Sequence, residues 1–234
     1  MSLEDLKTNL PNLHAAHLET KELQAQEKKN EWLALRLGKF TASEFYKLMA
    51  YENKETFPVG AESYVLEKVL EVLTVKSGQG FTSSAIDWGN QYEEEAAERF
   101  MTFSGKKVYN YGSTQQFVVK NKNVGCTPDG LIGTKSGLET KCPNSKTHLS
   151  YLNIKTQEEF KKECKNYYWQ IQGSMYVCNR NSWYFVSYDP RFKNKKHQLK
   201  VLKINRDEVD VKKLKWRLET AIEKRDEYLK EYDV

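Results

Sequence analysis

Residues 107–141 constrain the fold most, because they form a run of short β-prone stretches between long segments with helical patterns. Glycines and an asparagine separate the stretches, which predicts turns between successive strands. The stretches are Val108–Tyr109, Phe117–Val119, Val124–Thr127 and Leu138–Lys141. Further strands are predicted at residues 183–188 and 198–204. Helices, then a mixed sheet, then helices indicate an α/β layered fold, with a central mixed β-sheet flanked by helices.

Apolar spacing and end signals predict the helices. Thr41 as N-cap and Glu44 as the third residue of a helix fit a capping box. The predicted helices are 19–37, Ser43–Ala50, Ala61–Val75, Ser84–Phe103, several within 145–177, and 207–232. We expect one domain over residues 1–234, with a polar N-terminal arm at 1–18 and a C-terminal helix within 205–234.

Composition excludes several classes of protein. The chain has 234 residues, 12% aromatic residues and a net charge of +5, which does not fit a disordered or collagen-like chain. No apolar run approaches the ~20 residues that a membrane helix needs, and the N-terminus lacks the pattern of a secretory signal. We therefore expect a soluble intracellular protein without a membrane partner.

The four cysteines form no CxxC pair, which argues against a zinc ribbon or an iron–sulfur cluster. We expect reduced and mostly buried thiols, as is usual inside cells. The residues are Cys126, Cys142, Cys164 and Cys178.

Two carboxylates and a lysine lie close together within the predicted sheet. Asp129 stands between Pro128 and Gly130, in a turn between two strands. Ten residues later, Glu139 and Lys141 alternate along a strand, so both side chains point to the same face. An acid and a lysine beside a turn aspartate are costly to bury unless a cation binds there, and hard oxygen ligands favour Mg²⁺ or Mn²⁺ over zinc.

A third carboxylate comes from the helix predicted at Ser84–Phe103. Helical spacing places Glu93 on a stripe with Gly89, Ala96, Ala97 and Phe100, which we expect to face the core. Glu94 and Glu95 fall on solvated faces. An acid on a buried stripe is either paired or a ligand.

Each of these features, taken singly, is most often structural. A Pro-Asp-Gly turn commonly only shapes a loop, and a Glu-x-Lys alternation is commonly a solvated ion pair. In combination and in this order, they form the Asp…Glu-x-Lys pattern of metal-dependent phosphodiesterases.

The surrounding sequence closely resembles the phage lambda-type alkaline exonucleases, which are viral recombinase exonucleases of the PD-(D/E)XK nuclease superfamily. Five blocks in the same order carry the likeness: Trp32–Gly38 with Thr41–Ser43, Trp88–Glu93, Cys126–Leu131, Gly137–Pro143, and Gln170–Gln172 continuing through Trp183–Phe185 to Tyr188–Arg191. The resemblance implies the restriction-endonuclease-like core of that superfamily. It also implies a 5′→3′ exonuclease that degrades one strand of linear duplex DNA and leaves a 3′ single-stranded overhang.

The resemblance assigns roles to residues of this sequence. Asp129, Glu139, Lys141 and Gln170 would be catalytic. Glu93, Asp129, Glu139 and the backbone carbonyl of Thr140 would hold one or two Mg²⁺ ions, for which Mn²⁺ is expected to substitute. Lys141 would position the attacking water and help to deprotonate it.

A second set of residues would bind the DNA end. Arg36, Thr41 and Ser43 match the family's pocket for the 5′-terminal phosphate, and a forked guanidinium and a helix start suit an anion. Thr41 could equally serve only as a cap, and Arg36 could be an ordinary surface arginine.

Other candidates for contact with DNA are less specific. Ile86 falls where the family places an apolar residue that separates base pairs, although an isoleucine on a helix is more often core. Gln172 is a weaker candidate near the active site. The stretch from Arg191 to Lys203 contains no acid and could track a DNA backbone or form a solvated hairpin tip. Its cations are Arg191, Lys193, Lys195, Lys196, Lys200 and Lys203.

The sequence departs from the family at Tyr51–Val59, which is net acidic where the lambda enzyme has a basic loop. The resemblance implies a homo-oligomer, with a trimeric ring as one form, and a single-strand-annealing recombinase as a partner. If the chain is phage-encoded, the cytoplasm of the bacterial host is the expected location.

Three other functions compete with this interpretation. The first is an endonuclease on the same fold, which would also cut circular DNA. The second is a DNA-end-binding protein without activity. The third is an iron–sulfur nuclease, for which the cysteine spacing is unsuitable.

Overall fold

The structure is a computed structural model that describes residues 20, 23, 26–27, 30–74 and 84–233, with the side chains of 84–91 excepted. The chain divides into two compact units, Met1–Leu37 and Gly38–Val234. In the first unit, residues 30–36 are helical, and the Arg36 guanidinium lies over the Trp32 ring at 4.2 Å. The expectation of one domain over the whole chain stays a prediction.

The larger sheet of the second unit has the strand order β4-β5-β6-β7. Its strands are β4 (Gly130–Ile132), β5 (Ser136–Lys141), β6 (Ser182–Tyr188) and β7 (Leu199–Asn205). β5 and β6 run parallel, and the outer pairs are antiparallel. Gly137 is required where the central strands meet, because a Cβ there would lie 2.3 Å from the Trp183 ring. In this sheet, β5 lies between β4 and β6.

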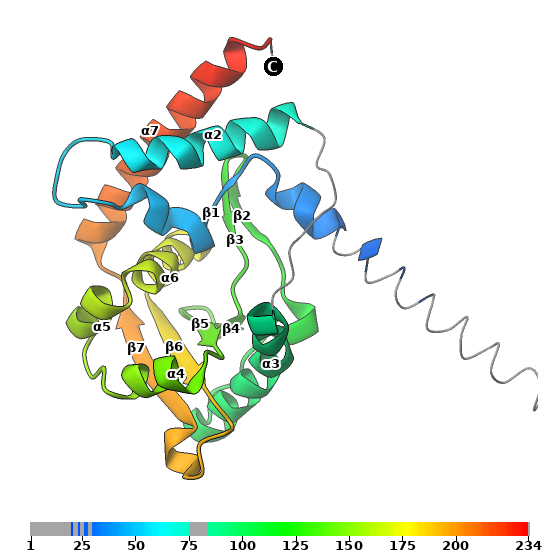
Figure 1. The fold of residues 1–234 in the computed structure, drawn as a ribbon, viewed down its shortest axis with the longest axis vertical. Helices are drawn as coiled ribbons and strands as arrows, with labels where there is room; N and C mark the ends of the chain where they lie inside the picture. Colours follow the sequence, from blue (N-terminus) through cyan, green and yellow to red (C-terminus); the bar gives the residue numbers. More distant parts are fainter. Residues whose placement is uncertain (1–19, 21–22, 24–25, 28–29, 75–83, 234) are drawn as a thin grey trace, which may run out of the picture. The chain divides into compact units, whose positions relative to one another are not determined.

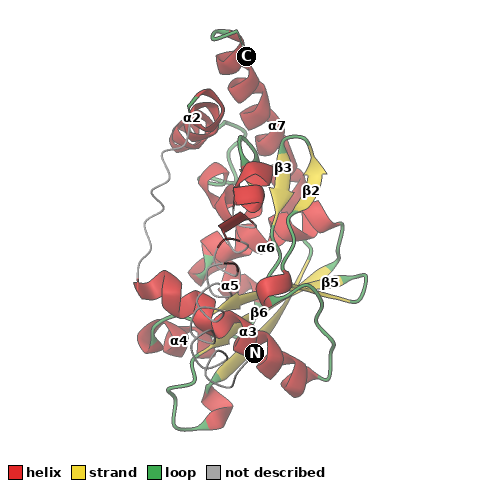
Figure 2. Ribbon diagram, turned by 90° about the vertical axis from the view of Figure 1, so that its right-hand side faces the viewer, coloured by secondary structure: helices red, strands yellow, loops and turns green. Residues whose placement is uncertain are grey.

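The smaller sheet has the order β1-β3-β2 and is also mixed, since β1 is parallel to β3 and β2 is antiparallel to it. Its strands are β1 (Phe40–Thr41), β2 (Val118–Asn121) and β3 (Val124–Cys126). The two sheets form separate groups of strands in Figure 2. The turn from β3 into β4 carries the chain from one sheet to the other.

Helices cover both sheets (Figure 1). They are the 3₁₀ helix η1 (Ala42–Leu48), α2 (Val59–Leu73), α3 (Ser84–Ser104), the 3₁₀ turn η2 (Gly112–Thr114), α4 (Ser145–Leu152), α5 (Gln157–Glu163), α6 (Lys165–Cys178), the 3₁₀ turn η3 (Lys195–His197) and α7 (Glu208–Lys230). α6 contacts strands of both sheets and packs most closely on η1. A Cβ at Gly173 would lie 2.3 Å from the Phe45 ring, so this glycine allows η1 to approach α6.

The α/β class with mixed sheets flanked by helices is confirmed. The helical region predicted at 145–177 consists of three helices, because the chain bends at Asn153–Thr156 and at Cys164. Asn144 and Thr156 cap the first two through their side chains. The stretch Val108–Tyr109 makes only an isolated bridge, between Tyr109 and Leu131.

The predicted capping box at Thr41 is wrong. Thr41 precedes η1, but its side chain makes no cap hydrogen bond, and the helix is a 3₁₀ helix that ends at Leu48. Glu44 pairs with Lys47 and Lys68 instead of turning back to the start of the helix. Two lysines therefore outcompete a backbone amide for this carboxylate.

No described helix combines the length and the apolar character needed to cross a lipid bilayer.

Candidate active site

Strand β5 brings Glu139 and Lys141 together, as their alternation predicts. Lys141 Nζ lies 2.5 Å from Glu139 Oε1. Glu139 is fully buried, because β4 and β6 flank its strand and α6 lies near its carboxylate, whereas the Lys141 side chain is 23% exposed. The lysine therefore lies between a buried carboxylate and the solvent.

Asp129 stands in the turn that joins β3 to β4. Its Oδ2 accepts hydrogen bonds from the Thr140 backbone nitrogen at 2.7 Å and from Thr140 Oγ1 at 3.0 Å. These two bonds attach the turn to β5, beside the Glu139–Lys141 pair. The Pro-Asp-Gly turn thus positions a carboxylate at the centre of the candidate site.

Glu93 approaches from α3. The apolar stripe predicted for this helix is confirmed at Ala96, Ala97 and Phe100, which are all buried. Burial and the nearby charge of Asp129 raise the pKa of Glu93 to about 7, against the smaller opposing effects of Lys141 and Gln115. A neighbouring prediction was incomplete, because Glu95 accepts a 2.6 Å hydrogen bond from Tyr188 Oη rather than being fully solvated.

The cluster contains three carboxyl groups but only one cationic side chain, Lys141. Burial and the Asp129 charge raise the pKa of Glu139 to about 8, although Lys141 opposes this rise. Burial alone would lower the pKa of Lys141, but the charges of Glu139 and Asp129 outweigh it and raise that pKa. Lys141 is consequently protonated in this arrangement. Two of the three carboxyl groups, Glu93 and Glu139, have pKa values at or above neutral pH, so their ionised forms are disfavoured.

The donor set suits a divalent cation. Glu139 Oε2 is buried and has no hydrogen-bond partner. A cation that accepts this oxygen would also relieve the repulsion among the three carboxylates. Within the described part of the chain, no three His, Cys, Asp or Glu side chains are already gathered into a metal-binding group. Asp129 Oδ2 turns to Thr140 and Glu139 Oε1 turns to Lys141, so a metal would require these side chains to adjust.

Gln170 joins the site from α6. Its Nε2 donates to Glu139 Oε1 at 2.5 Å, which agrees with its predicted place at the edge of the site. It also lines a cavity of about 490 Å³ that reaches Ser43 on η1. Gln170 therefore contacts the carboxylate cluster through Glu139 and also lines the cavity that reaches the segment expected to bind a terminal phosphate.

Tyrosines that the sequence reasoning missed line the same cavity: Tyr46, Tyr151 and Tyr167. Lys141 Nζ lies 5.3 Å from the centre of the Tyr167 ring, within the range of a cation–π contact. The available signal was helical spacing, because Tyr167 precedes Gln170 by three residues and so shares its face of α6.

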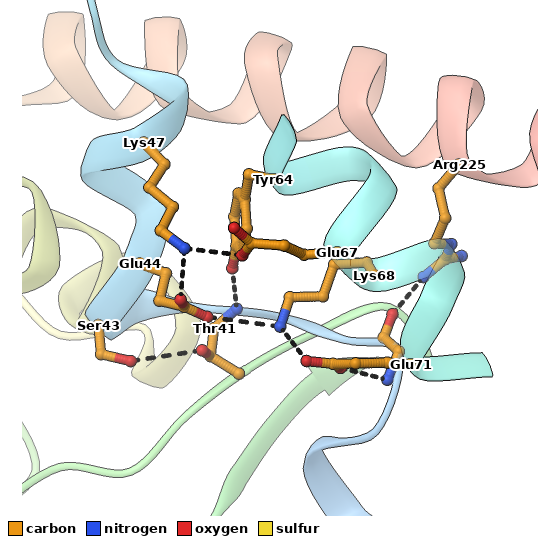
Figure 3. A network of polar contacts seen from close by, with 10 residues as sticks. Thr41, Ser43, Glu44, Lys47, Tyr64, Glu67, Lys68, Glu71 and Arg225 are labelled. Carbon is orange, nitrogen blue, oxygen red and sulfur yellow. Dashed lines mark hydrogen bonds and ion pairs between the residues drawn. The ribbon is translucent and has the colours of Figure 1, made fainter. Parts of the chain in front are cut away.

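Thr41 and Ser43 lie close together at the start of η1 (Figure 3). Their hydroxyl oxygens are 3.4 Å apart. Thr41 is buried and its backbone nitrogen donates to Tyr64 Oη at 3.2 Å, whereas Ser43 is exposed and lines the cavity. Of the two, Ser43 is the residue accessible to a ligand. Arg36 belongs to the unit Met1–Leu37, and its part in a phosphate pocket stays a prediction.

Behind this segment lies a network that we name the η1–α2 cluster (Figure 3). Its members are Glu44, Lys47, Glu67, Lys68 and Glu71. Lys68 is buried between Glu44 and Glu71, and Glu71 also accepts a 2.9 Å hydrogen bond from the Gly38 backbone nitrogen. The cluster thereby fixes the backbone on both sides of Thr41.

The remaining candidates for contact with DNA differ in whether their side chains are already engaged within the protein. Gln172 is fully buried, and its amide is engaged by the backbones of Asn205 and Asp207, which leaves it no group for DNA. Arg191 makes two bonds from its guanidinium to the buried Asp189, at 2.7 and 3.0 Å. This pair gives Arg191 a structural role.

The lysines of the same stretch also differ from one another. Lys193, Lys195 and Lys196 are exposed, and Lys203 is exposed as well. Lys200 donates to the Ile154 carbonyl. The side chain of Ile86 lies outside the described residues.

All four cysteines are free thiols. Cys126 Sγ and Cys178 Sγ are 3.5 Å apart, although 52 residues separate them in the sequence. Three of the four are buried, as expected.

Comparison with known proteins identifies the family to which the chain belongs. A family described as the YqaJ-like viral recombinase domain matches residues 31–181, which is more than half of the chain. None of the curated proteins matches.

Solved structures give further likenesses. The alkaline exonuclease LHK-Exo from Laribacter hongkongensis is 28% identical with a TM-score of 0.70, over 87% of this chain and 97% of that one. LHK-Exo in complex with dAMP gives a TM-score of 0.71 at the same identity and coverage. A phage-related exonuclease from Haemophilus somnus 129PT is 19% identical with a TM-score of 0.64, over 83% of this chain and 96% of that one, which supports the fold.

Proposed function

Because the chain belongs to the YqaJ-like viral recombinase family, we propose that it is a metal-dependent 5′→3′ exonuclease of linear duplex DNA. It would hydrolyse one strand from a 5′-phosphorylated end and leave 3′ single-stranded overhangs for strand annealing. The observation that carries this proposal is the carboxylate cluster around Lys141, in which Glu139 Oε2 is buried without a partner. The likeness to LHK-Exo, at 28% identity over most of both chains, supports a nuclease.

The proposed metal ligands are Glu93, Asp129, Glu139 and the Thr140 backbone carbonyl. One or two Mg²⁺ ions held there, or Mn²⁺ in their place, would lower the pKa of the attacking water and stabilise charge on the attacking and leaving oxygens. The raised pKa values of Glu93 and Glu139 support this assignment, because they arise from burial and from the nearby charge of Asp129, both of which a bound cation would offset.

Lys141 would orient the attacking water and handle its proton. Its Nζ is fixed by Glu139 Oε1 and faces the Tyr167 ring, which restricts where it can point. The charges of Glu139 and Asp129 raise its pKa. Once those carboxylates are neutralised, burial becomes the dominant influence and favours the neutral amine, which can accept the water proton. Gln170 would hold Glu139 Oε1 in place during this change.

The 5′-terminal nucleotide would occupy the cavity between Ser43 and Gln170. Ser43 would donate to the terminal phosphate, with Thr41 supporting its hydroxyl. Arg36 stays a candidate on the sequence likeness alone. The tyrosines of the cavity offer ring faces to a sugar or base. That LHK-Exo was obtained with dAMP supports a nucleotide site in this family.

Further parts of the proposal concern the cellular context. We expect a homo-oligomer, with a trimeric ring as one form, and a single-strand-annealing recombinase as partner. We expect the protein to act in the cytoplasm of a bacterial host.

The test compares linear duplex DNA carrying a 5′-phosphate with the same DNA carrying a 5′-hydroxyl, in Mg²⁺, with closed circular duplex as control. We expect rapid loss of the phosphorylated linear DNA, slow loss of the hydroxyl form and no loss of circles. Ser43→Ala should reduce the preference for the phosphate. Equal cutting of circles would identify an endonuclease, and binding of ends without hydrolysis would identify an end-binding protein.

A further inference from the structure

A second cavity lies between the C-terminal part of α3 and the η3 turn. Its volume is about 560 Å³. The lining residues are Arg99, Thr102 and Phe103 from α3 and Lys195, Lys196 and Leu199 from the η3 region. Three of these six residues are cations and none is an acid, so the cavity attracts anions.

The three cations are available to a ligand. Within the described residues, neither Arg99 nor Lys195 nor Lys196 takes part in an ion pair; both lysines are exposed, and Arg99 is half-buried at the cavity wall. Arg191, four residues before Lys195, is by contrast bound to Asp189. Unpaired cations from two separate elements can contact successive phosphates, which is the usual arrangement in a site that follows a nucleic-acid backbone.

Phe103 determines which form of nucleic acid fits. Its side chain is 71% exposed, and it shares the cavity with the three cations. A duplex presents its phosphates to cations but keeps its base faces stacked inside. An exposed ring beside cations is instead suited to an unpaired base, which can stack on it.

The cavity is linked to the candidate active site through α3. Glu93 and Phe103 are ten residues apart on one helix, which corresponds to about 15 Å along its axis. Ala97 and Phe100, between them, pack the helix against the larger sheet. The two ends of the helix therefore lie at a fixed spacing.

We propose that the α3–η3 cavity binds single-stranded DNA, with Arg99, Lys195 and Lys196 on the phosphates and Phe103 under a base. This inference rests on the proposed function in one respect, because that function would supply the single strand as its undegraded product. A strand held there would keep the enzyme attached to its DNA between successive cleavages.

The test measures binding without hydrolysis. The full chain in EDTA is titrated against a fluorescent oligothymidine and against a blunt duplex of the same length, by fluorescence anisotropy at several salt concentrations. The variants are Phe103→Leu and the double variant Lys195→Gln/Lys196→Gln. The matched control is Lys212→Gln/Lys215→Gln, which removes two exposed charges from α7.

We expect Phe103→Leu to weaken binding of the oligothymidine about fivefold or more, because a base stack is lost, with little change for the duplex. The double lysine variant should lower the slope of log affinity against log salt concentration for single-stranded DNA by about 1.4, as expected for the loss of two phosphate contacts. The control should behave as wild type.

Unchanged single-strand binding in both variants would overturn the proposal. Equal weakening for duplex and single strand would also overturn it, and would identify a duplex groove instead. Because binding is measured in EDTA, where no hydrolysis occurs, the two proposals can fail separately. A chain that binds oligothymidine through Phe103 in EDTA but degrades no DNA in Mg²⁺ would refute the proposed exonuclease and leave this site intact. Melting curves of the variants verify that the fold is kept.

Discussion

The carboxylate cluster on β5 and the η1–α2 cluster both bury charged side chains, but they balance their charges differently. The first places Glu93, Asp129 and Glu139 around the single cation Lys141. In the second, Lys47 and Lys68 bridge the three acids, and a backbone nitrogen also donates to Glu71. Similar residue types thus produce one site with excess negative charge and one nearly compensated network.

The pKa values follow this difference. Burial would raise the pKa of Glu44, but the hydrogen bonds and charges of Lys47 and Lys68 outweigh it and lower that pKa. Burial and Asp129 raise the pKa of Glu139 to about 8. A network that satisfies its own charges stabilises the fold, whereas a site that does not is suited to an additional ligand. Substitutions in the two clusters should therefore have different effects.

The largest expected effect is on activity. Lys141→Ala should reduce the rate of DNA hydrolysis by about 10²–10⁴-fold, because the group that orients and deprotonates the water is lost. Lys47→Ala in the η1–α2 cluster should change the rate by about twofold or less, because Lys47 contacts acids that serve the fold. Single-turnover hydrolysis of linear duplex measures both. A residual rate above a tenth of wild type in Lys141→Ala would contradict the assignment.

The next effect is stabilisation by metal. Mg²⁺ at about 100 times its dissociation constant should stabilise the fold by about 2.7 kcal/mol, because it binds only the folded chain. Asp129→Asn should abolish most of the increase in melting temperature, whereas Glu67→Gln should retain it. Thermal melting with and without Mg²⁺ measures this. An undiminished increase in Asp129→Asn would place the metal elsewhere.

Removal of Lys68 tests the compensated network. Lys68→Met keeps the length of the side chain but leaves Glu44 and Glu71 without their shared partner. We expect a loss of about 2 kcal/mol in the free energy of unfolding, because Lys68 is buried while the two acids retain some solvent.

The control for Lys68→Met is Lys224→Ala, which breaks a more exposed pair with Glu62 and should cost less than about 1 kcal/mol. Urea denaturation measures both. Equal losses in the two variants would show that burial of the Lys68 network contributes nothing extra.

The last effect is a difference in pH dependence between the clusters. The folded-state pKa of Glu139 is raised from 4.5 to about 8, so without metal its charge destabilises the fold increasingly as pH rises through that window. The stabilising effect of Glu139→Gln on the metal-free protein should therefore be larger at pH 9 than at pH 5. The difference should be at least about 1.4 kcal/mol, which corresponds to one pKa unit.

Glu44→Gln should change the stability of the protein in the opposite direction. Because the folded-state pKa of Glu44 is lowered, its stabilising contribution is present above its usual pKa and is lost as pH falls. The substitution should destabilise the protein at neutral pH and matter less in acid. Melting temperatures in EDTA across the pH range measure both variants, and shifts of the same sign would refute the contrast between the clusters.

Much of the candidate site could be predicted from local sequence. The alternation of Glu139 and Lys141 predicted a shared face, and the ion pair confirms it. Helical spacing placed Glu93 on the buried stripe of α3. The turn around Asp129 could be predicted because Pro128 and Gly130 restrict the backbone on either side.

Long-range contacts were not predictable in this way. Gln172 was left open to DNA by its sequence context, but its side chain is fully buried and the backbones of Asn205 and Asp207 engage its amide. Glu44 was expected to be a local cap, whereas Lys47 and Lys68, the latter 24 residues away, hold its carboxylate. Arg99 and the η3 turn line one cavity, although nothing in the local sequence around either of them indicates this.

The sequence by itself determined the α/β pattern, the turn at Asp129 and the faces on which Glu93, Glu139 and Lys141 lie. These depend on backbone restrictions and on the periods of helix and strand, which act over a few residues. Only the tertiary structure decided which charges are balanced. Burial and Coulomb interactions depend on neighbours that the fold brings together from distant parts of the chain, and so Lys68 completes its network while Glu139 keeps an unpaired oxygen.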